Sequence, residues 1–326
     1  MRDLPQSIED LDKLKILDVS IVSSFDQTGF LRHRAQFDPR DETVDCTGRI
    51  ALITGANSGI GFATAEELAR RGMTVYLLCR NPNRGEEAER KIRSATGSDT
   101  VYFHPLDLSD LEQVKESVQS LKERLNTDID VLIHNAGILP LEEHRSAQGY
   151  ELTLATNLLG HHLLTHLLWS HLKGRMILVS SGGMYLSPLS TAELFQQKKS
   201  KFDGVRRYAL TKRAQVALAE IWADKGKEQG VAVYSMHPGW VATPGVEHSL
   251  PGFWKRMEHR LRDPIGGADT VIWLSSTQQK LQSGEFFFDR AVRPKHVLPW
   301  QSHSPNEKKK LWAALEKSIQ DYLDKE

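Results

Sequence analysis

The chain has 326 residues, 40% of them hydrophobic, which is enough for one large α/β domain with a real core or at most two small domains. Basic and acidic residues both number 42, so the formal net charge is zero and nothing indicates a nucleic-acid partner. The two cysteines, Cys46 and Cys79, are too few for a disulfide framework or a zinc knuckle, and they favour a reducing compartment, the cytoplasm.

Residues 1–46 precede any regular alternation of apolar and helical patterns. The N-terminus is acidic and polar, and no run of about 18 apolar residues occurs anywhere, so we expect an unprocessed protein with no integral membrane segment. Attachment of this arm to a membrane surface is opposed by its acids, and we expect it to pack on its own domain or on a second subunit. The apolar positions concerned are Leu11, Leu14, Ile16, Leu17, Val19, Ile21 and Val22.

Residues 47–290 alternate between short apolar runs and helical spacing. The runs predicted as strands are RIALIT (49–54), TVYLLC (74–79), TVYFHPLD (100–107), IDVLIHNAG (129–137), RMILVSS (175–181), VAVYSMHPG (231–239) and GEFFFD (284–289). Helices are predicted near 63–71, 111–125, 152–172, 209–223 and 268–274. This order predicts an α/β fold with a single doubly wound parallel sheet and helices on both faces. Residues 291–326 form a C-terminal extension with an amphipathic helix from about 306.

A glycine-rich turn follows the first predicted strand. Gly55, Gly59 and Gly61 have the spacing T-G-x-x-x-G-x-G and open the helical segment FATAEELARR. The backbone N–H groups at a helix N-terminus carry partial positive charge, and glycines let a pyrophosphate approach the backbone. For this motif alone, a tight strand-to-helix turn without a ligand is the alternative.

Further motifs follow in order: Asp107 in PLDLSD, Asn135-Ala136-Gly137, Asn157, Ser180-Ser181, Tyr208-x-x-x-Lys212 and Pro238-Gly239. With them, residues 47–290 resemble the short-chain dehydrogenase/reductase family of Rossmann-like proteins. SSGGMY, HPGWVATPGV, SLPGFWKRM and TGFLRHRAQFDP narrow the resemblance to one branch of that family. The resemblance implies a dinucleotide-binding catalytic domain over 47–290. The cofactor-binding positions it implies are Gly55, Asn57, Ser58, Gly59, Ile60, Gly61, Arg80, Asp107, Leu108, Asn135, Ala136, Gly137, Tyr208, Lys212, Pro238, Gly239, Val241 and Thr243.

Tyr208 and Lys212 lie one helical turn apart. Tyrosine normally ionises at about pH 10, and an ammonium group on the same helical face would lower its pKa. The resemblance implies that Lys212 also holds the nicotinamide ribose, that Ser181 hydrogen-bonds the reacting oxygen of the substrate, and that Asn157 positions a relay water. The implied activity is hydride transfer between nicotinamide and a carbonyl or alcohol. In isolation, Tyr208 and Lys212 would be an ordinary surface pair, and Asn157 a polar residue bonded to its own helix.

The separation of Ser181 from Tyr208 is 27 residues, which is longer than the compact spacing of the family. The extra stretch, LSTAELFQQKKSKFDG, is expected to be a helix-capable surface excursion whose basic KKSK run is solvated. Retinol-dehydrogenase-like branches of the family resemble this chain in having an extended stretch there.

Arg80 follows the second strand, directly after Cys79, where NAD-preferring relatives carry an aspartate. A guanidinium suits a 2′-phosphate, so NADP(H) is the expected cofactor, with Asp107 accepting from the adenine amino group as in the family. The alternative is an arginine that only extends into solvent.

Thirteen histidines raise the possibility of a metal site. His162 and His166 lie four residues apart on one helical face, with His161 and His171 nearby, but no H-E-x-x-H motif or local carboxylate accompanies them. We therefore expect no metal. The surrounding run LLGHHLLTHLLW suits packing against a neighbouring subunit in a homodimer or homotetramer, and His134 is expected to fill a strand end.

The segment 243–261 is predicted to be a hinged lid over a small lipophilic carbonyl or alcohol. Its apolar side comprises Val246, Leu250, Phe253, Trp254 and Met257, at roughly helical spacing. Packing of these residues on the domain or on a partner subunit is the alternative. At the level of function, the alternative is a non-catalytic NADP(H)-binding sensor or interaction module, against which the presence of both Tyr208 and Lys212 argues.

Overall fold

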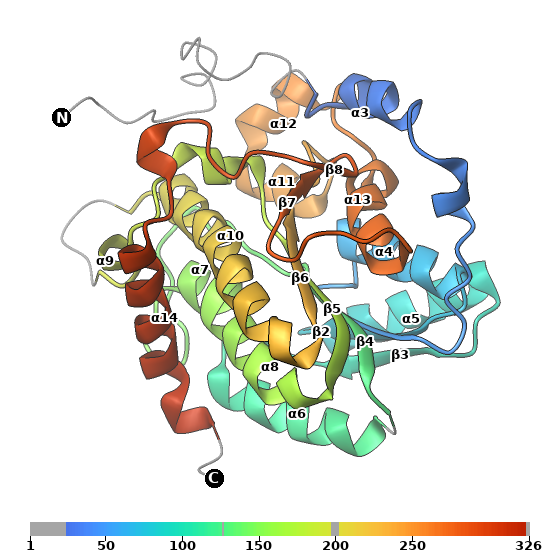
Figure 1. The fold of residues 1–326 in the computed structure, drawn as a ribbon, viewed down its shortest axis with the longest axis horizontal. Coiled ribbons are helices and arrows are strands. Elements are labelled where there is room, and N and C mark those ends of the chain that lie inside the picture. The colour runs from blue at the N-terminus through green and yellow to red at the C-terminus, as the bar shows by residue number, and fades with distance from the viewer. Residues whose placement is uncertain (1–23, 126, 197–201, 324–326) are drawn as a thin grey trace.

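The computed structural model describes residues 24–125, 127–196 and 202–323 (Figure 1). Its centre is an eight-stranded sheet with the strand order β3-β2-β1-β4-β5-β6-β7-β8. All neighbouring strands are parallel except β8, which runs antiparallel to β7. The doubly wound parallel sheet predicted from the sequence is confirmed. The strands are β1 (Ile50–Thr54), β2 (Thr74–Cys79), β3 (Val101–Pro105), β4 (Ile129–His134), β5 (Leu172–Val179), β6 (Ala232–Met236), β7 (Phe286–Phe288) and β8 (Ala291–Val292).

Helices cover both faces of the sheet, and an apolar core fills the space beneath each layer (Figure 1). One layer contains α4 (Gly59–Arg70), α5 (Pro82–Thr96) and α13 (Pro264–Ser276). The other contains α6 (Leu111–Arg124), α8 (Gly160–Leu168) and α10 (Gly204–Gln229). The remaining helices are α3 (Gln27–Arg34), α7 (Leu152–Leu154), α9 (Thr191–Leu194), α11 (Pro244–Ser249), α12 (Pro251–Met257) and α14 (Pro305–Ile319).

Two helical stretches differ from the sequence prediction. The helix expected over 152–172 is divided into α7, a π-helical segment (Ala155–Leu159), α8 and a 3-10 turn (Trp169–His171). Helix α5 was not predicted, because its sequence is mostly charged and it buries only Gly85, Ala88 and Ile92. Its start is nevertheless encoded locally, since the Asn81 side chain accepts from the N–H of Arg84 and Pro82 occupies the first turn.

The first described residues run across the carboxyl edge of the sheet. We call residues 24–34 the N-terminal strap. The buried Arg262 guanidinium donates to the carbonyls of Ser24 (2.6 Å) and Phe25 (3.0 Å) and forms a salt bridge with Asp289 at 2.6 Å. Asp26 caps α3 and pairs with Arg260. The strap therefore packs on its own domain. The apolar positions 11–22, on which the expectation for the arm rests, lie outside the described residues, so that expectation stays a prediction.

Helix α14 lies against α10 and α9 (Figure 1). It buries Leu311, Leu315 and Ile319 in the same apolar core as α8 and α10. The α8 run that suggested a subunit contact is thus largely covered within the chain itself, which removes that argument for an oligomer. No helix in the described parts of the chain is both long and apolar enough to cross a membrane.

The long stretch between Ser181 and Tyr208 forms a 3-10 turn (Gly182–Leu186) followed by the short helix α9. The KKSK run at 198–201 lies outside the described residues, so its predicted solvation stays a prediction.

Candidate active site

The glycine-rich turn joins β1 to α4. Gly55 and Gly59 have φ values of +66° and +55°, a region that side chains disfavour. Gly61 is needed for packing, because a Cβ there would lie 2.5 Å from the side-chain nitrogen of Asn135. The Ser58 side chain occupies the N-cap of α4 without forming a capping hydrogen bond. Asn57 and Ile60 flank these positions, so the turn presents backbone N–H groups at a helix N-terminus, as an anion site requires.

The end of β4 is tied to β1 through Thr54. The Thr54 hydroxyl accepts from the backbone N–H groups of Asn135 (2.9 Å) and Ala136 (3.0 Å). The Asn135 side chain donates to the Thr54 carbonyl at 2.9 Å. A Cβ on Gly137 would lie 3.2 Å from the Lys212 Nζ. These contacts bring the loop after β4 next to both the glycine turn and the lysine.

Ser181, Tyr208 and Lys212 lie close together at the end of β5 and the start of α10. Lys212 is buried, its Nζ donates to the Val179 carbonyl at 2.9 Å, and it lies 5.4 Å from the centroid of the Tyr208 ring. The Ser181 hydroxyl accepts from the N–H of Gly183 at 3.1 Å and also hydrogen-bonds the Tyr208 side chain. Ser180 instead donates to the Lys212 carbonyl at 2.8 Å.

Burial is the largest cause of the pKa shifts of Lys212 and Tyr208. It lowers the pKa of Lys212 to about 7 and raises the pKa of Tyr208 above its ordinary value, while the hydrogen bond from Ser181 acts in the opposite direction on Tyr208. Lys212 is not among these causes, so the expectation that it lowers the pKa of Tyr208 stays a prediction. The group that stabilises the phenolate here is Ser181.

Asn157 lies in the π-helical segment before α8 and connects three elements. Its side-chain oxygen accepts from the N–H of Ile138 (2.9 Å), and its nitrogen donates to the Ile138 carbonyl and to the Thr211 hydroxyl, both at 3.1 Å. A π-bulge frequently marks a functional position in a helix. Asn157 thereby joins the loop after β4 to α10, next to Lys212.

The expected ribose and adenine side of the site lies where β2 and β3 end. Cys79 is buried, and Arg80 is 69% exposed at its side chain, with its Nε 3.9 Å from Asp107. One Asp107 oxygen accepts from the N–H and the hydroxyl of Ser109, which leaves the other facing Arg80. The Leu108 side chain is buried, so only its backbone can serve a ligand.

The loop after β6 brings Pro238, Gly239, Val241 and Thr243 to the same edge. Thr243 caps α11, and its methyl group would lie 3.1 Å from a Cβ on Gly59, so this loop meets the glycine turn. Gly239 has φ +81°, and a Cβ there would lie 2.4 Å from the Arg262 Nε. Pro238 and Val241 are both buried.

One neighbour of this loop, Phe25, was not identified from the sequence. Phe25 lies edge-on to His237 at 4.4 Å between ring centroids and packs against Trp240 at 5.7 Å. A Cβ on Gly182 would lie 3.0 Å from the Phe25 ring, so this ring supports the turn that carries Ser181. Sequence reasoning missed it because the only signal was a lone aromatic residue far upstream.

The segment predicted as a lid forms α11 and α12. Its apolar side is half-buried at Val246, Leu250, Phe253, Trp254 and Met257. Phe253 touches Trp240 edge-on at 5.5 Å between ring centroids, and no residue of α12 is fully buried. The apolar side of this segment is therefore neither buried in the core nor fully exposed to solvent.

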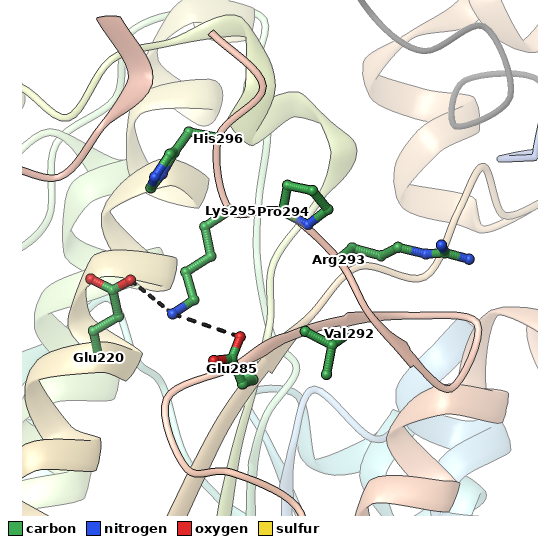
Figure 2. Close-up of a pocket in the computed structure, with 7 residues that line it drawn as sticks. All are labelled: Glu220, Glu285, Val292, Arg293, Pro294, Lys295 and His296. Carbon is green, nitrogen blue, oxygen red and sulfur yellow. Dashed lines mark ion pairs between the residues drawn. The ribbon is translucent and has the colours of Figure 1, made fainter. Parts of the chain in front are cut away.

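A separate pocket of about 410 Å³ lies between the C-terminal extension and two glutamates of the preceding domain (Figure 2). Lys295 crosses it and pairs with Glu220 at 3.1 Å and with Glu285 at 3.9 Å. None of its lining residues was predicted as a site residue, and its charges already neutralise one another. Its residues are Glu220, Glu285, Val292, Arg293, Pro294, Lys295 and His296.

His134 and His161 lie close together in the core, with their ring centroids 4.6 Å apart. His134 hydrogen-bonds the Thr165 hydroxyl at 2.8 Å, and His161 approaches Thr54 at 3.1 Å. Burial holds the pKa of His134 well below its usual range and lowers that of His161 to about 3, so both are neutral at pH 7. The prediction that His134 fills a strand end is consistent with this packing.

Comparisons with known proteins identify the class of this fold and site. A family model described as short chain dehydrogenase matches residues 49–251. The chain belongs to the short-chain dehydrogenase/reductase family of oxidoreductases. Human "Dehydrogenase/reductase SDR family member 12" is 40% identical over 305 residues, covering 91% of this chain and 95% of that protein. This finding confirms the branch that the sequence motifs indicated.

Two more distant similarities are informative. Human "Retinol dehydrogenase 11" is 34% identical, with 76% of this chain and 79% of that protein covered. A short-chain dehydrogenase from Shigella flexneri, solved in complex with NADP, has the same fold with a TM-score of 0.60 and 23% identity. That alignment covers 77% of this chain and all (100%) of the Shigella chain.

Proposed function

We propose that the protein is an NADP(H)-dependent oxidoreductase acting on the carbonyl or alcohol group of a small lipophilic molecule. The observation that carries the proposal is the convergence of Asn157, Ser181, Tyr208 and Lys212 beside the glycine turn. These four come from the π-helical segment, the end of β5 and the first turns of α10. Side chains from separate elements meet there with hydrogen bonds that fix the serine, the lysine and the asparagine.

The chain's own residues supply the proton and the orientation. Tyr208 is the acid that protonates the carbonyl oxygen in reduction, and Ser181 hydrogen-bonds the same oxygen and the phenol. Lys212, with a pKa of about 7, can exchange a proton near neutral pH, and Asn157 fixes the loop that adjoins its amine. The bound nicotinamide would supply or accept the hydride.

The residues fit a dinucleotide. The left-handed Gly55, the uncapped start of α4 and the tight packing of Gly61 make a turn with room for a pyrophosphate. Arg80 is exposed beside Asp107, and position 79 carries a thiol in place of a carboxylate that would repel a 2′-phosphate. This combination favours NADP(H) over NAD(H). The NADP bound by the Shigella dehydrogenase supports the same preference.

The lipophilic character of the substrate rests on the segment after β6. Helices α11 and α12 present a half-buried apolar side next to Trp240 and the loop that carries Thr243. This apolar surface of α11 and α12 can exclude water and can contact an apolar substrate when one is bound. The name of the relative retinol dehydrogenase 11 indicates an apolar alcohol for that protein and supports this class here.

The test is oxidation of NADPH in the presence of a panel of steroid, retinoid, fatty-aldehyde and aromatic carbonyls. We expect turnover with at least one of them, and we expect Tyr208→Phe to lower the rate by about 10² to 10⁴ while NADPH still binds. Tyr234→Phe is the matched control, because this phenol donates to the Leu281 carbonyl at 3.4 Å in another part of the core. Tight NADPH binding without turnover on any carbonyl would favour a sensor over an enzyme.

A further inference from the structure

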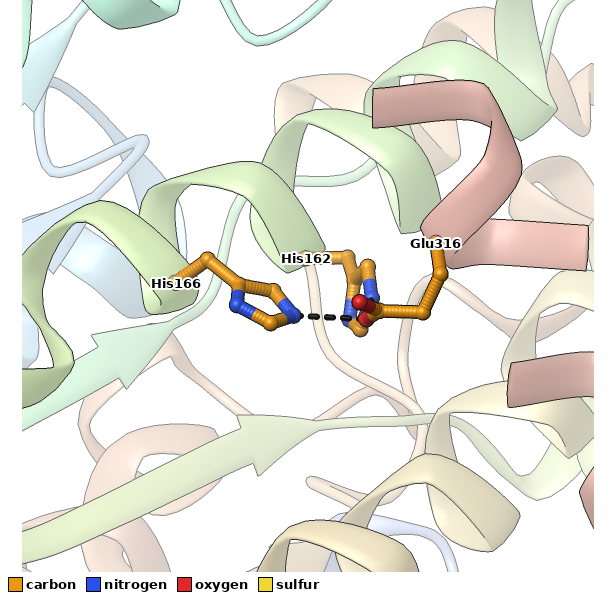
Figure 3. A group of neighbouring side chains, drawn as sticks. All are labelled: His162, His166 and Glu316. Carbon is orange, nitrogen blue, oxygen red and sulfur yellow. Dashed lines mark hydrogen bonds and ion pairs between the residues drawn. The ribbon is translucent and has the colours of Figure 1, made fainter. Parts of the chain in front are cut away.

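Outside the catalytic group, two histidines and a glutamate converge at the contact between α8 and α14 (Figure 3). The Nε2 atoms of His162 and His166 lie 2.9 Å and 2.7 Å from the same carboxylate oxygen of Glu316. His162 is completely buried, while 22% of the His166 side chain and 31% of the Glu316 side chain are exposed. The sequence prediction of no metal considered only carboxylates near the histidines, whereas folding brings one from 150 residues away.

We propose that His162, His166 and Glu316 form a binding site for a divalent transition metal, with zinc as the best match. Imidazole nitrogen and carboxylate oxygen are ligands that zinc accepts, and three protein ligands leave a fourth position for water. The i and i+4 spacing on α8 directs both rings to one side of the helix. The candidate ligand atoms all lie within 4.8 Å of one another.

Two adjustments are needed to admit an ion. Zinc bonds of about 2.0 to 2.1 Å in a tetrahedral arrangement place ligand atoms about 3.3 Å apart, so each histidine–carboxylate pair must separate by about half an ångström, and the two histidine nitrogens, which lie within 4.8 Å of each other, must approach by up to roughly 1.5 Å. Glu316 can supply the first movement and His166 the second, because both side chains are partly exposed. The buried His162 ring stays fixed between its neighbours.

An apolar shell of tryptophans holds the two imidazoles. The Trp222 ring lies 5.7 Å from His162 and 4.9 Å from His166, and the Trp312 ring lies 4.9 Å and 5.7 Å from the same two rings. Since Trp222 belongs to α10 and Trp312 to α14, three helices enclose the group. Such a shell restricts water and limits ring rotation, which favours a preformed site.

One feature limits the expected affinity. A metal on Nε2 leaves the ring proton of His162 on Nδ1, and within the described residues that buried atom has no hydrogen-bond partner. Metal-bound histidines usually donate this proton to an acceptor, which strengthens binding. We therefore expect micromolar affinity, with the ion acting as a reversible link between α14 and α8 and taking no part in hydride transfer.

The experiment uses untagged full-length protein freed of metal with a chelator. We expect visible d–d absorption on titration with Co²⁺, competition by Zn²⁺, and a higher melting temperature with excess Zn²⁺. Glu316→Gln and His166→Gln should each weaken Co²⁺ binding by more than about tenfold. Glu316→Gln retains an oxygen that accepts from the two rings, so its melting temperature without metal shows whether it has folded.

His171→Gln is the matched control, since His171 lies just beyond α8 and contacts Ser170. It should bind Co²⁺ like the parent protein. No visible absorption and no thermal shift in the parent would overturn the proposal. Binding that persists unchanged in Glu316→Gln would overturn it as well, by locating the ion elsewhere.

Discussion

The two halves of the sheet's carboxyl edge are held by different interactions. On the side of β1 to β4, the loops are fixed by backbone geometry and short contacts, such as Gly55 with φ +66° and Thr54 bonded to Asn135. On the side of β6 and β7, the loops are held by a buried ion pair, Arg262 with Asp289, and by the N-terminal strap. The first arrangement joins short motifs that can be recognised in the sequence, although Thr54 and Asn135 are 81 positions apart, and the second joins residues that belong to no such motif.

This difference has a functional meaning within the family. The first side adjoins the glycine turn, where backbone groups and glycines suffice to approach a pyrophosphate. The second side adjoins the proposed substrate lid, where an added segment such as the strap can reshape the surroundings without disturbing the nucleotide turn. We therefore expect substitutions in the two halves to separate effects on cofactor affinity from effects on stability and substrate choice.

The largest effect on stability should come from breaking the ion pair of the second half. Arg262 and Asp289 are 1% exposed, so Arg262→Met leaves the buried Asp289 carboxylate with His33 in place of the guanidinium as its charged neighbour, and it should cost about 3 to 5 kcal/mol in the free energy of unfolding. Denaturant titration measures this loss. Arg40→Met is the control, because Arg40 pairs with Asp38 at the same 2.6 Å but its side chain is 90% exposed. Equal midpoints for Arg262→Met and the parent would mean that the strap side is not held by this pair.

The sequence could predict the first half but not this ion pair. Short stretches of sequence are enough to recognise the strands, the glycine turn, Asn135 and the Tyr208–Lys212 spacing. Arg262 is a surface-like residue in the sequence, and its partners at Ser24, Phe25 and Asp289 are up to 238 positions away. Glu316 escaped notice for the same reason. Long-range polar contacts leave no periodic signal, so only the folded chain reveals them.

The next largest effect is expected on cofactor affinity. Arg80 is an exposed side chain on the side of β1 to β4, where the other contacts are made by backbone groups. Arg80→Ala should weaken NADPH binding by about ten- to hundredfold, or roughly 1.5 to 3 kcal/mol, because a charge-assisted contact to the 2′-phosphate is lost. NADH affinity should change little. Calorimetry on both cofactors is the measurement, with Arg90→Ala on α5 as an exposed control. If NADPH affinity stays at the parent value, Arg80 does not select the cofactor.

Lys212 lies where the two halves meet, and it should make stability depend on pH. Burial lowers its pKa to about 7 from 10.5, so between these values the unfolded chain holds a proton that the folded chain lacks. Stability contributed by this residue therefore rises with pH across that window, by at most about 1.4 kcal/mol per pH unit, and is lost as pH falls toward 7.

Lys212→Met should remove this slope and abolish turnover at the same time. Thermal unfolding of the parent and the variant, both without cofactor, from pH 7 to pH 9.5 provides the comparison. Parallel curves for the two proteins would show that the lysine keeps its proton when buried. We expect the stability of the variant to exceed that of the parent by more at pH 7 than at pH 9.5. This result would show that the buried amine of Lys212 reduces the stability of the fold.

The smallest effect concerns the lid on the substrate side. Trp254 is only half-buried on α12, and the aromatic contact of this helix joins Phe253 to Trp240. If the segment closes over an apolar substrate, Trp254→Ala should raise KM several-fold for bulky carbonyls, leave KM for small ones nearly unchanged and barely alter the melting temperature. Trp222→Ala is a useful contrast, because that ring is buried among α8, α10 and α14 and its loss should cost about 3 to 5 kcal/mol without dependence on substrate size. A collapsed melting temperature for Trp254→Ala with unchanged KM would make α12 part of the core. The substrate half would then be as rigid as the nucleotide half, and substrate choice would have to lie in the loop around Trp240.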